Sequence, residues 1–225
     1  MSFAVSRSEI EKWTADMVRI PSYPGIANQE MEVAKYIKSV FDAEGIDCHI
    51  DELDDGRANA IAVLKGTGEG KSLMFNGHTD TVPPYDMDRA CDPWVEGNFL
   101  HGRGANDMKG ELAAAMAALI SLKRRGVELA GDVILCAVAD EEEGSLGTIR
   151  MLQAGYTADA CVICESLAMD SISVLQKGLE WYQIDFTGKT VHGGAFRQGI
   201  NAIEKASTSF RWWRRNSSPR WRSEP

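Results

Sequence analysis

Long apolar runs are absent from this sequence. The longest, residues 112–122, falls well short of the roughly 18 residues that a membrane-spanning helix needs, so we expect a buried helix there. Glu9, Glu11 and Lys12 interrupt the N-terminal region, and a secretory signal peptide requires an unbroken apolar stretch. These absences predict a cytoplasmic protein with no membrane partner.

Cysteine is scarce, and its count of five is odd, which disfavours a framework of disulfides. Cys136, Cys161 and Cys164 lie in strand-like apolar runs, as reduced thiols of a core do. The last two have C-x-x-C spacing, but no second pair accompanies them. We therefore favour simple packing over a zinc ribbon or a redox site.

Basic residues are outnumbered, with 24 Lys and Arg against 33 Asp and Glu and a net charge of -9. This balance disfavours nucleic acid as the partner and favours a small molecule. Residues 208–225 are the exception, because they hold five arginines and three of the six tryptophans without clear periodicity. We interpret them as an atypical tail produced by truncation or a change of reading frame, in preference to a nucleic-acid-binding run.

Helix-like and strand-like segments alternate along the first three quarters of the chain. Periodicity predicts helices over residues 8–20, 29–45, 108–125 and 145–154, and strands over 46–50, 60–64, 73–75, 133–139 and 160–164. A capping box from Ser8 to Glu11 is expected to begin the first helix, and Gly45 to end the second. Apolar strands separated by helices predict an α/β fold whose central sheet is flanked by helices.

The pattern changes near Leu175, where residues 181–186 alternate as a half-exposed strand does. We therefore expect three parts. Residues 1–174 form the first domain, residues 175–207 begin a second, smaller domain, and residues 208–225 are the tail.

Potential metal ligands follow the predicted strands or precede a predicted helix in four places: His78 with Asp80, Asp107, the run Asp140 to Glu143, and Glu165. Each place has an ordinary alternative, such as a hydrogen-bonded structural histidine or a helix cap. However, loops beyond the carboxyl ends of the strands form the crevice of an open α/β sheet, so the four can converge.

Crowding of the acidic residues is the argument for a cation. Two carboxylates about 4 Å apart repel by ~4 kcal/mol at an effective dielectric constant of ~20. Four consecutive acids at the edge of a crevice therefore call for a positive ion. One imidazole with several carboxylates matches a catalytic zinc-type site of mixed nitrogen and oxygen ligands.

In order and context, these stretches resemble the dinuclear-zinc amidohydrolases, a family that includes acetylornithine deacetylase, succinyl-diaminopimelate desuccinylase, aminoacylase and carboxypeptidase G. The matching stretches are G-H-T-D-T-V-P at 77–83, G-R-G-A-N-D-M-K-G at 102–110, D-E-E-E-G-S-L-G at 140–147 and C-E-S at 164–166. G-K-T-V-H at 188–192, followed by G-I-N-A-I at 199–203, resembles the start of that family's lid or dimerisation domain.

The resemblance implies a mixed central sheet with a small α+β lid, and two Zn²⁺ ions per complete subunit, with Co²⁺ or Mn²⁺ as alternatives. His78 and Glu165 would hold one ion, Asp107 would bridge the pair, and Glu142 would hold the second. The glutamate at position 165 resembles the deacylase and desuccinylase branch more than the aminopeptidase branch.

The resemblance also implies a reaction and a partner. Asp80 would orient the ligand histidine, Glu141 would be the general acid and base, and His192 would stabilise the oxyanion, often in the active site of a second subunit. A zinc-bridged hydroxide would then hydrolyse the amide bond of an N-acyl amino acid or small peptide. A complete chain is expected to be a homodimer.

The sequence departs from the family pattern in two respects. Phe196 stands where the family usually has proline, and no histidine follows His192, although the family's last zinc ligand is a later histidine. We therefore expect a truncated chain in which residues 1–174 form an incomplete catalytic domain and the second zinc keeps only Asp107 and Glu142. Three hypotheses remain open: a hydrolase fully active only as a complete chain, an inactive remnant, and a non-catalytic cation-binding module.

Overall fold

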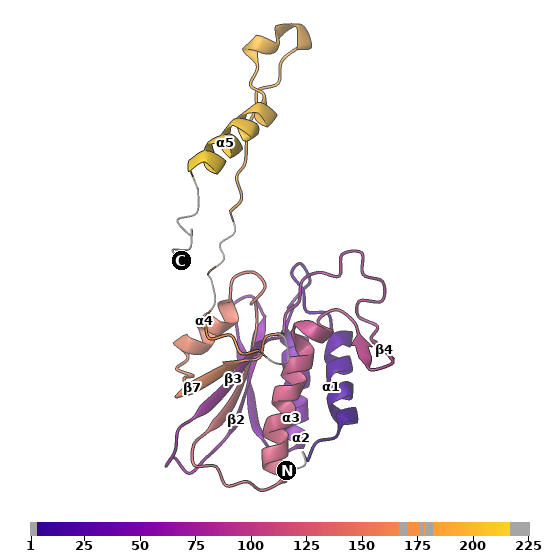
Figure 1. Cartoon of the computed structure of the whole chain (residues 1–225), viewed down its shortest axis with the longest axis vertical. Coiled ribbons are helices and arrows are strands. Elements are labelled where there is room, and N and C mark those ends of the chain that lie inside the picture. The colour runs from indigo at the N-terminus through magenta and orange to yellow at the C-terminus, as the bar shows by residue number, and fades with distance from the viewer. Residues whose placement is uncertain (1–3, 167–170, 176–177, 179–181, 217–225) are drawn as a thin grey trace. The chain divides into compact units, whose positions relative to one another are not determined.

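A computed structural model describes residues 4–166, 171–175, 178 and 182–216 of the chain. The chain divides into two compact units, Met1–Ser171 and Ile172–Pro225 (Figure 1). Each unit is described by itself.

The first unit is built on a five-stranded mixed sheet with the order β1-β2-β6-β3-β7. Its strands are β1 (Asp47–Glu52), β2 (Ala58–Leu64), β3 (Leu73–His78), β6 (Val133–Val138) and β7 (Ala160–Ile163). The pairs β1–β2 and β2–β6 are antiparallel, whereas β3 runs parallel to both β6 and β7. The predicted α/β class with a mixed central sheet is confirmed.

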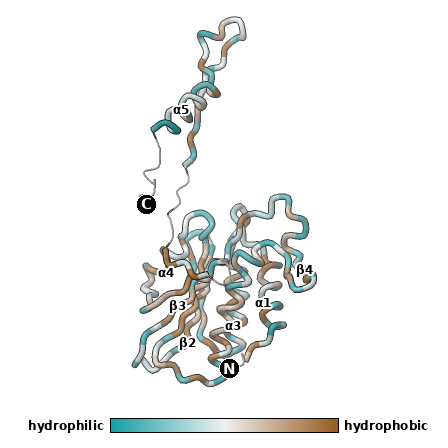
Figure 2. The backbone as a smooth tube through the Cα atoms, viewed as in Figure 1, coloured by the Kyte–Doolittle hydropathy of each residue, from teal (hydrophilic) through white to brown (hydrophobic). Residues whose placement is uncertain are grey.

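Helices cover both faces of this sheet (Figure 1). The larger core lies under α1 (Arg7–Arg19), α2 (Met31–Ala43) and α3 (Gly110–Arg124). A smaller core on the opposite face contains Met151 of α4 (Leu146–Gln153). Figure 2 shows hydrophobic residues gathered along the strands and α3. All six residues of β6 are buried, because this strand is central and covered on both sides.

Strand β7 lies at the edge of the sheet and differs from the expectation of a buried strand. All four of its residues are exposed; the strand pairs only with β3 and contributes to neither core. The expectation of a core thiol is therefore wrong for Cys161, which is exposed, whereas it is correct for the buried Cys136. All five cysteines are free.

The capping box at the start of α1 is present, but it uses other residues than the sequence predicted. The capping box of α1 uses Ser6 and Glu9 rather than Ser8 and Glu11: the Ser6 Oγ accepts from the Glu9 N–H at 3.3 Å, and a Glu9 oxygen accepts from the Ser6 N–H at 2.8 Å. Arg124 of α3 also binds Glu9 at 2.7 Å, a tertiary contact that favours this pair. Helix α2 was expected to end at Gly45, but its C-cap residue is Glu44; Gly45 follows with the expected positive φ, 64°.

A short hairpin that the sequence analysis did not predict precedes the metal-ligand stretch at 102–110. It consists of β4 (Trp94–Glu96) and β5 (Phe99–His101). The Trp94 ring stacks on His101 with centroids 4.7 Å apart, and Arg89 lies 4.7 Å from the centre of the indole.

In its described residues, the second unit contains a 3₁₀ helix, η2 (Gly193–Gln198), α5 (Ala202–Asn216) and an isolated bridge between Lys189 and Ile200. The strand predicted over 181–186 is wrong for its described residues, 182–186, which do not form a strand. Position 181 lies outside the described residues.

Helix α5 runs through the predicted 207/208 boundary, so residues 208–216 are regular structure rather than an aperiodic tail. Ile203, Phe210 and Trp213 recur at helical spacing, and their side chains are 79%, 58% and 58% exposed. No helix in the described part of the chain is both long and apolar enough to cross a membrane.

Candidate metal centre

The carboxyl ends of β3, β6 and β7 meet at one edge of the sheet because the three strands run parallel. His78 is the last residue of β3, Glu141 and Glu142 follow β6, and Glu165 follows β7. Asp107 arrives from the turn η1 (Ala105–Lys109), directly before α3. Side chains up to 87 residues apart in the sequence thus approach the same place.

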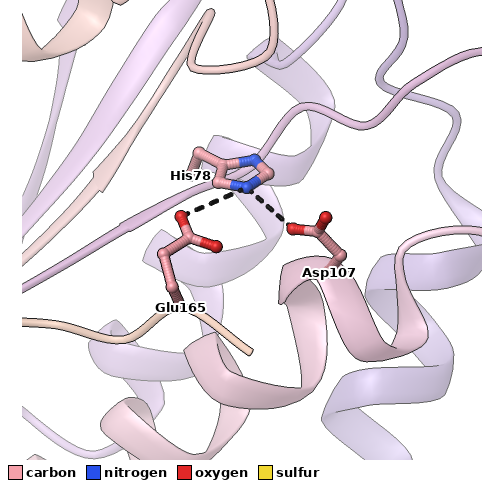
Figure 3. Close-up of side chains that lie close together, drawn as sticks. All are labelled: His78, Asp107 and Glu165. Carbon is pink, nitrogen blue, oxygen red and sulfur yellow. Dashed lines mark hydrogen bonds and ion pairs between the residues drawn. The ribbon is translucent and has the colours of Figure 1, made fainter. Parts of the chain in front are cut away.

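Three of these side chains come close enough to share an ion. One potential ligand atom each from His78, Asp107 and Glu165 lies within 4.8 Å of the others. The His78 Nε2 atom is 3.1 Å from Asp107 Oδ1 and 3.7 Å from Glu165 Oε1. Figure 3 shows both carboxylates directed at the same edge of the imidazole.

Asp80 holds the opposite edge of the imidazole. His78 Nδ1 lies 2.9 Å from the Asp80 carbonyl oxygen and 3.4 Å from its carboxylate. The same carboxylate accepts hydrogen bonds from the backbone N–H groups of Glu141, at 3.1 Å, and Glu142, at 3.0 Å. Asp80 thus joins the end of β3 to the loop after β6, and it directs Nε2 toward the acidic cluster.

The charges around His78 favour a cation at Nε2. Burial by itself lowers the pKa of His78, but the hydrogen bond to Asp80 and the negative charges of Asp80, Glu165 and Glu141 outweigh it and raise the pKa to about 10. The pKa of Glu165 is raised by burial and by the neighbouring carboxylates, although the His78 charge opposes this. Negative charge is therefore in excess at this point.

Glu141 and Glu142 take different positions at the edge of the cluster. Glu141 Oε2 lies 3.8 Å from His78 Nε2, and its side chain is 45% exposed. Glu142 accepts a hydrogen bond from the Val82 N–H at 3.1 Å and is outside the three-residue ligand group of the described residues. Burial, followed by the charge of Asp107, raises the pKa of Glu142.

His192 lies in the second unit, so its position is described only within that unit. It is the N-cap of η2, and its Nδ1 accepts from the Gly194 N–H at 3.2 Å. Its role stays a prediction.

Glu111 is a carboxylate near the cluster that the sequence analysis missed. Its Oε2 is buried without a hydrogen-bond partner in the described part of the chain. Burial, followed by the Asp107 charge, raises its pKa. The available signal was its place in the first turn of α3, directly after the stretch that carries Asp107.

The turn that carries Asp107 is packed tightly by its neighbours. A Cβ atom at Gly77 would lie 2.5 Å from Met108 Cε, and one at Gly104, whose φ is 80°, would lie 2.5 Å from Thr81 Cγ2. Lys109 is 1% exposed and donates to the carbonyls of Met17 and Ile20, both at 3.0 Å. Asp107 does not cap α3, since the N-cap residue is Lys109.

The donor set fits a divalent cation. One neutral imidazole nitrogen with several carboxylate oxygens is the ligand type of catalytic zinc sites. The unpartnered buried oxygen of Glu111 and the charges that raise the pKa of His78 to about 10 both indicate missing positive charge.

Comparison with protein families places the chain among known hydrolases. The model of peptidase family M20/M25/M40 matches residues 74–222. A probable succinyl-diaminopimelate desuccinylase from Staphylococcus aureus (strain MRSA252) is 33% identical over 184 residues, which is 79% of this chain and 44% of the relative.

A second curated relative has a different named substrate. The N-formyl-4-amino-5-aminomethyl-2-methylpyrimidine deformylase of Halalkalibacterium halodurans is 29% identical over 216 residues, which is 89% of this chain and 50% of the relative. The chain thus spans about half the length of these curated relatives.

Solved structures share the fold. A tripeptidase from Staphylococcus aureus Mu50 superposes with a TM-score of 0.66 at 20% identity, covering 92% of this chain and 56% of that one. The aminopeptidase PepT from Bacillus cereus gives 0.61 at 20% identity, covering 92% and 57%.

Proposed function

Because this chain belongs to peptidase family M20/M25/M40, a family of metal-dependent hydrolases, we propose that it cleaves the amide bond of N-acyl amino acids or small peptides. The observation that carries the proposal is the approach of His78, Asp107 and Glu165 to within 4.8 Å at the carboxyl edge of the sheet. Both curated relatives are named for removing an acyl group, succinyl in one and formyl in the other, which favours a deacylase.

The proposal assigns two ions per complete subunit, Zn²⁺ in preference to Co²⁺ or Mn²⁺. His78 and Glu165 would hold one, Asp107 would bridge both, and Glu142 would hold the second. Such ions, when bound, supply a water of lowered pKa and polarise the carbonyl of the substrate.

The proposed proton carrier is Glu141. Its position 3.8 Å from His78 Nε2 and its exposure of 45% leave the carboxylate open to water and substrate. Glu141 would accept a proton from the attacking water and return it to the leaving amine. His192, from a partner subunit of a homodimer, would donate to the developing oxyanion.

The experiment combines metal analysis with a hydrolysis assay. The purified chain is loaded with Zn²⁺ and dialysed, its metal content is measured by mass spectrometry, and amine release from N-succinyl and N-formyl amines is followed. We expect bound zinc and hydrolysis. We expect Glu141→Gln to keep the metal and to lose on the order of 10²–10⁴-fold in rate.

The matched control is Glu143→Gln, an exposed acid in the same loop that should change neither quantity. A chain that binds no metal would overturn the proposed centre. Bound metal without hydrolysis would favour a cation-binding module, and unchanged turnover in Glu141→Gln would remove this residue from its proposed role.

A further inference from the structure

The loop that carries Glu141 and Glu142 is held at both ends by the beginning of strand β2. In the β2–β6 register, Ala60 stands opposite Ala137. Continuing this antiparallel register brings Arg57 to the level of Asp140, two residues after Val138, the last residue of β6. The segment Arg57-Ala58-Asn59 carries no metal ligand and was not singled out in the sequence.

Arg57 lies between two buried carboxylates. Its Nη1 donates to Asp140 Oδ1 at 2.7 Å, while Nε and Nη2 donate to the two oxygens of Glu30 at 2.8 and 2.5 Å. The side chains of Arg57, Asp140 and Glu30 are 7%, 4% and 0% exposed. A planar guanidinium group that is hydrogen-bonded along both of its edges is held in one orientation. The guanidinium of Arg57 therefore fixes the position of Asp140 relative to α2.

Asp140 in turn closes the loop on itself. It has a positive φ of 68°, and its Oδ2 accepts from the N–H of Leu146, the first residue of α4, at 3.2 Å. Its carbonyl oxygen accepts from the N–H groups of Gly144, at 3.1 Å, and Ser145. The guanidinium of Arg57 thus fixes Asp140, whose hydrogen bonds to residues 144–146 hold the turn together.

Asn59 holds the two ends of the loop together. Its Oδ1 accepts from the Ala139 N–H at 3.0 Å, and its Nδ2 donates to the Gly147 carbonyl at 2.9 Å. Asn59 is fully buried. A side chain at Gly147 would collide with the Ala139 backbone and would lie 2.5 Å from Asn59 Oδ1, which explains the last glycine of the D-E-E-E-G-S-L-G stretch.

The fixed loop reaches the metal centre through its backbone. The N–H groups of Glu141 and Glu142 donate to Asp80 at 3.1 and 3.0 Å, and Asp80 holds His78 Nδ1. A shift of Asp140 would therefore move both carboxylates and loosen the histidine.

We propose that Arg57 and Asn59 are positioning residues that clamp the loop 140–147, and that through this loop they hold Glu141, Glu142 and His78 in place for a cation. The clamp contacts no reacting atom. The part that concerns the cation rests on the proposed function, whereas the part that concerns the loop does not.

The test compares Arg57→Lys with Arg124→Lys, both in the whole chain. Lysine keeps the positive charge but loses the planar guanidinium. Arg124 is a matched control because its guanidinium also binds two carboxylates, Glu9 at 2.7 Å and Glu44 at 2.6 Å. These contacts join helices and do not involve the loop 140–147. A second variant, Asp140→Asn, removes the charge on the loop side while keeping a residue that tolerates positive φ.

Hydrogen exchange of the metal-free protein is the first readout. We expect Arg57→Lys and Asp140→Asn to speed amide exchange at least tenfold in residues 140–147 and to leave the exchange rates in the strands of the sheet unchanged. We expect Arg124→Lys to leave the exchange rates of the loop unchanged. Faster exchange spread evenly over the sheet, or a loop as protected as in the wild type, overturns the clamp.

The second readout is titration with Co²⁺, followed by calorimetry and by the visible absorption of the bound ion. We expect Arg57→Lys to weaken binding at least tenfold and to change the absorption spectrum, while Arg124→Lys does neither. Identical affinity and spectra in Arg57→Lys overturn the cation part alone. A wild-type chain that binds no Co²⁺ overturns both that part and the proposed centre, and the exchange result still decides the clamp.

Discussion

At the scale of single residues, excess negative charge governs the candidate metal centre. His78 is the one imidazole that reaches the described cluster, and its pKa is raised to about 10. Because a metal ligand must be unprotonated, an incoming cation would displace a proton from this ring. The cluster therefore has a place for positive charge that either a proton or a metal can fill.

Hydrogen bonds and charge also shift the pKa of Glu9, which is not part of the metal centre, and this shift predicts a pH dependence of the protein's stability. The hydrogen bond from Arg124 and the bonds to Ser6 lower the pKa of Glu9 from 4.5 to about 2. Its contribution to stability is therefore complete above pH 4.5 and is lost as the pH falls through about 2. We expect Glu9→Gln to lower the free energy of unfolding at pH 6, and the difference from wild type to shrink steadily below pH 4.5.

Urea unfolding at several pH values between 6 and 3 measures this difference. The control is Glu11→Gln, since Glu11 pairs with the exposed Arg7 on the same helix and an exposed pair contributes little. A Glu9→Gln effect that does not change with pH would exclude the charged capping box as its source.

At the scale of the elements, the place of a strand in the sheet decides what its side chains contribute. Strands β6 and β7 are both apolar runs in the sequence, yet β6 is entirely buried and β7 entirely exposed. Strand β6 has a strand on each side and contributes side chains to the cores on both faces, whereas β7 has one neighbour and contributes to neither core.

This difference predicts unequal costs for similar truncations. Leu135 in β6 is 0% exposed and Val162 in β7 is 46% exposed. We expect Leu135→Ala to cost about 2–5 kcal/mol of unfolding free energy, because it leaves a cavity, and Val162→Ala to cost within about 0.5 kcal/mol. Chemical denaturation of both variants measures the costs, and equal losses would contradict the edge position of β7.

At the scale of the whole molecule, a bound cation is expected to add to the stability of the fold. The cluster joins β3, η1 and the segment after β7, so an ion held there would bind the folded chain and not the unfolded one. A ligand at 100 times its dissociation constant stabilises by ~2.7 kcal/mol.

We therefore expect the zinc-loaded chain to lose several degrees in melting temperature on addition of a chelator, and to regain them on addition of excess Zn²⁺. Differential scanning calorimetry measures the shift. His78→Asn is the control, because it removes a ligand atom and should make the melting temperature insensitive to the chelator. A chelator effect of equal size in that variant would place the stabilising ion elsewhere.

Much of the architecture could be predicted from local pattern. Apolar spacing predicted helices α1 to α4 and the five strands of the mixed sheet within a few positions, but not the β4–β5 hairpin, because the periods of a helix and a strand depend on neighbouring residues. The residue types at the strand ends likewise indicated His78 and Glu165, and Asp107 was indicated by its place before the helix of residues 108–125. The prediction of a strand at 181–186 is wrong for the described residues 182–186, because alternation of side chains does not by itself create the backbone pairing of a strand.

The sequence by itself determined the elements, the α/β class and the kind of ligand at each strand end, since these depend on residues close together in the chain. Only the tertiary structure decided that β7 is an exposed edge, that Glu9 meets Arg124, and that Arg57 meets Asp140. The last two contacts join residues 115 and 83 positions apart. Such contacts have no local pattern, because the sheet order and helix packing that create them arise only when the whole unit folds.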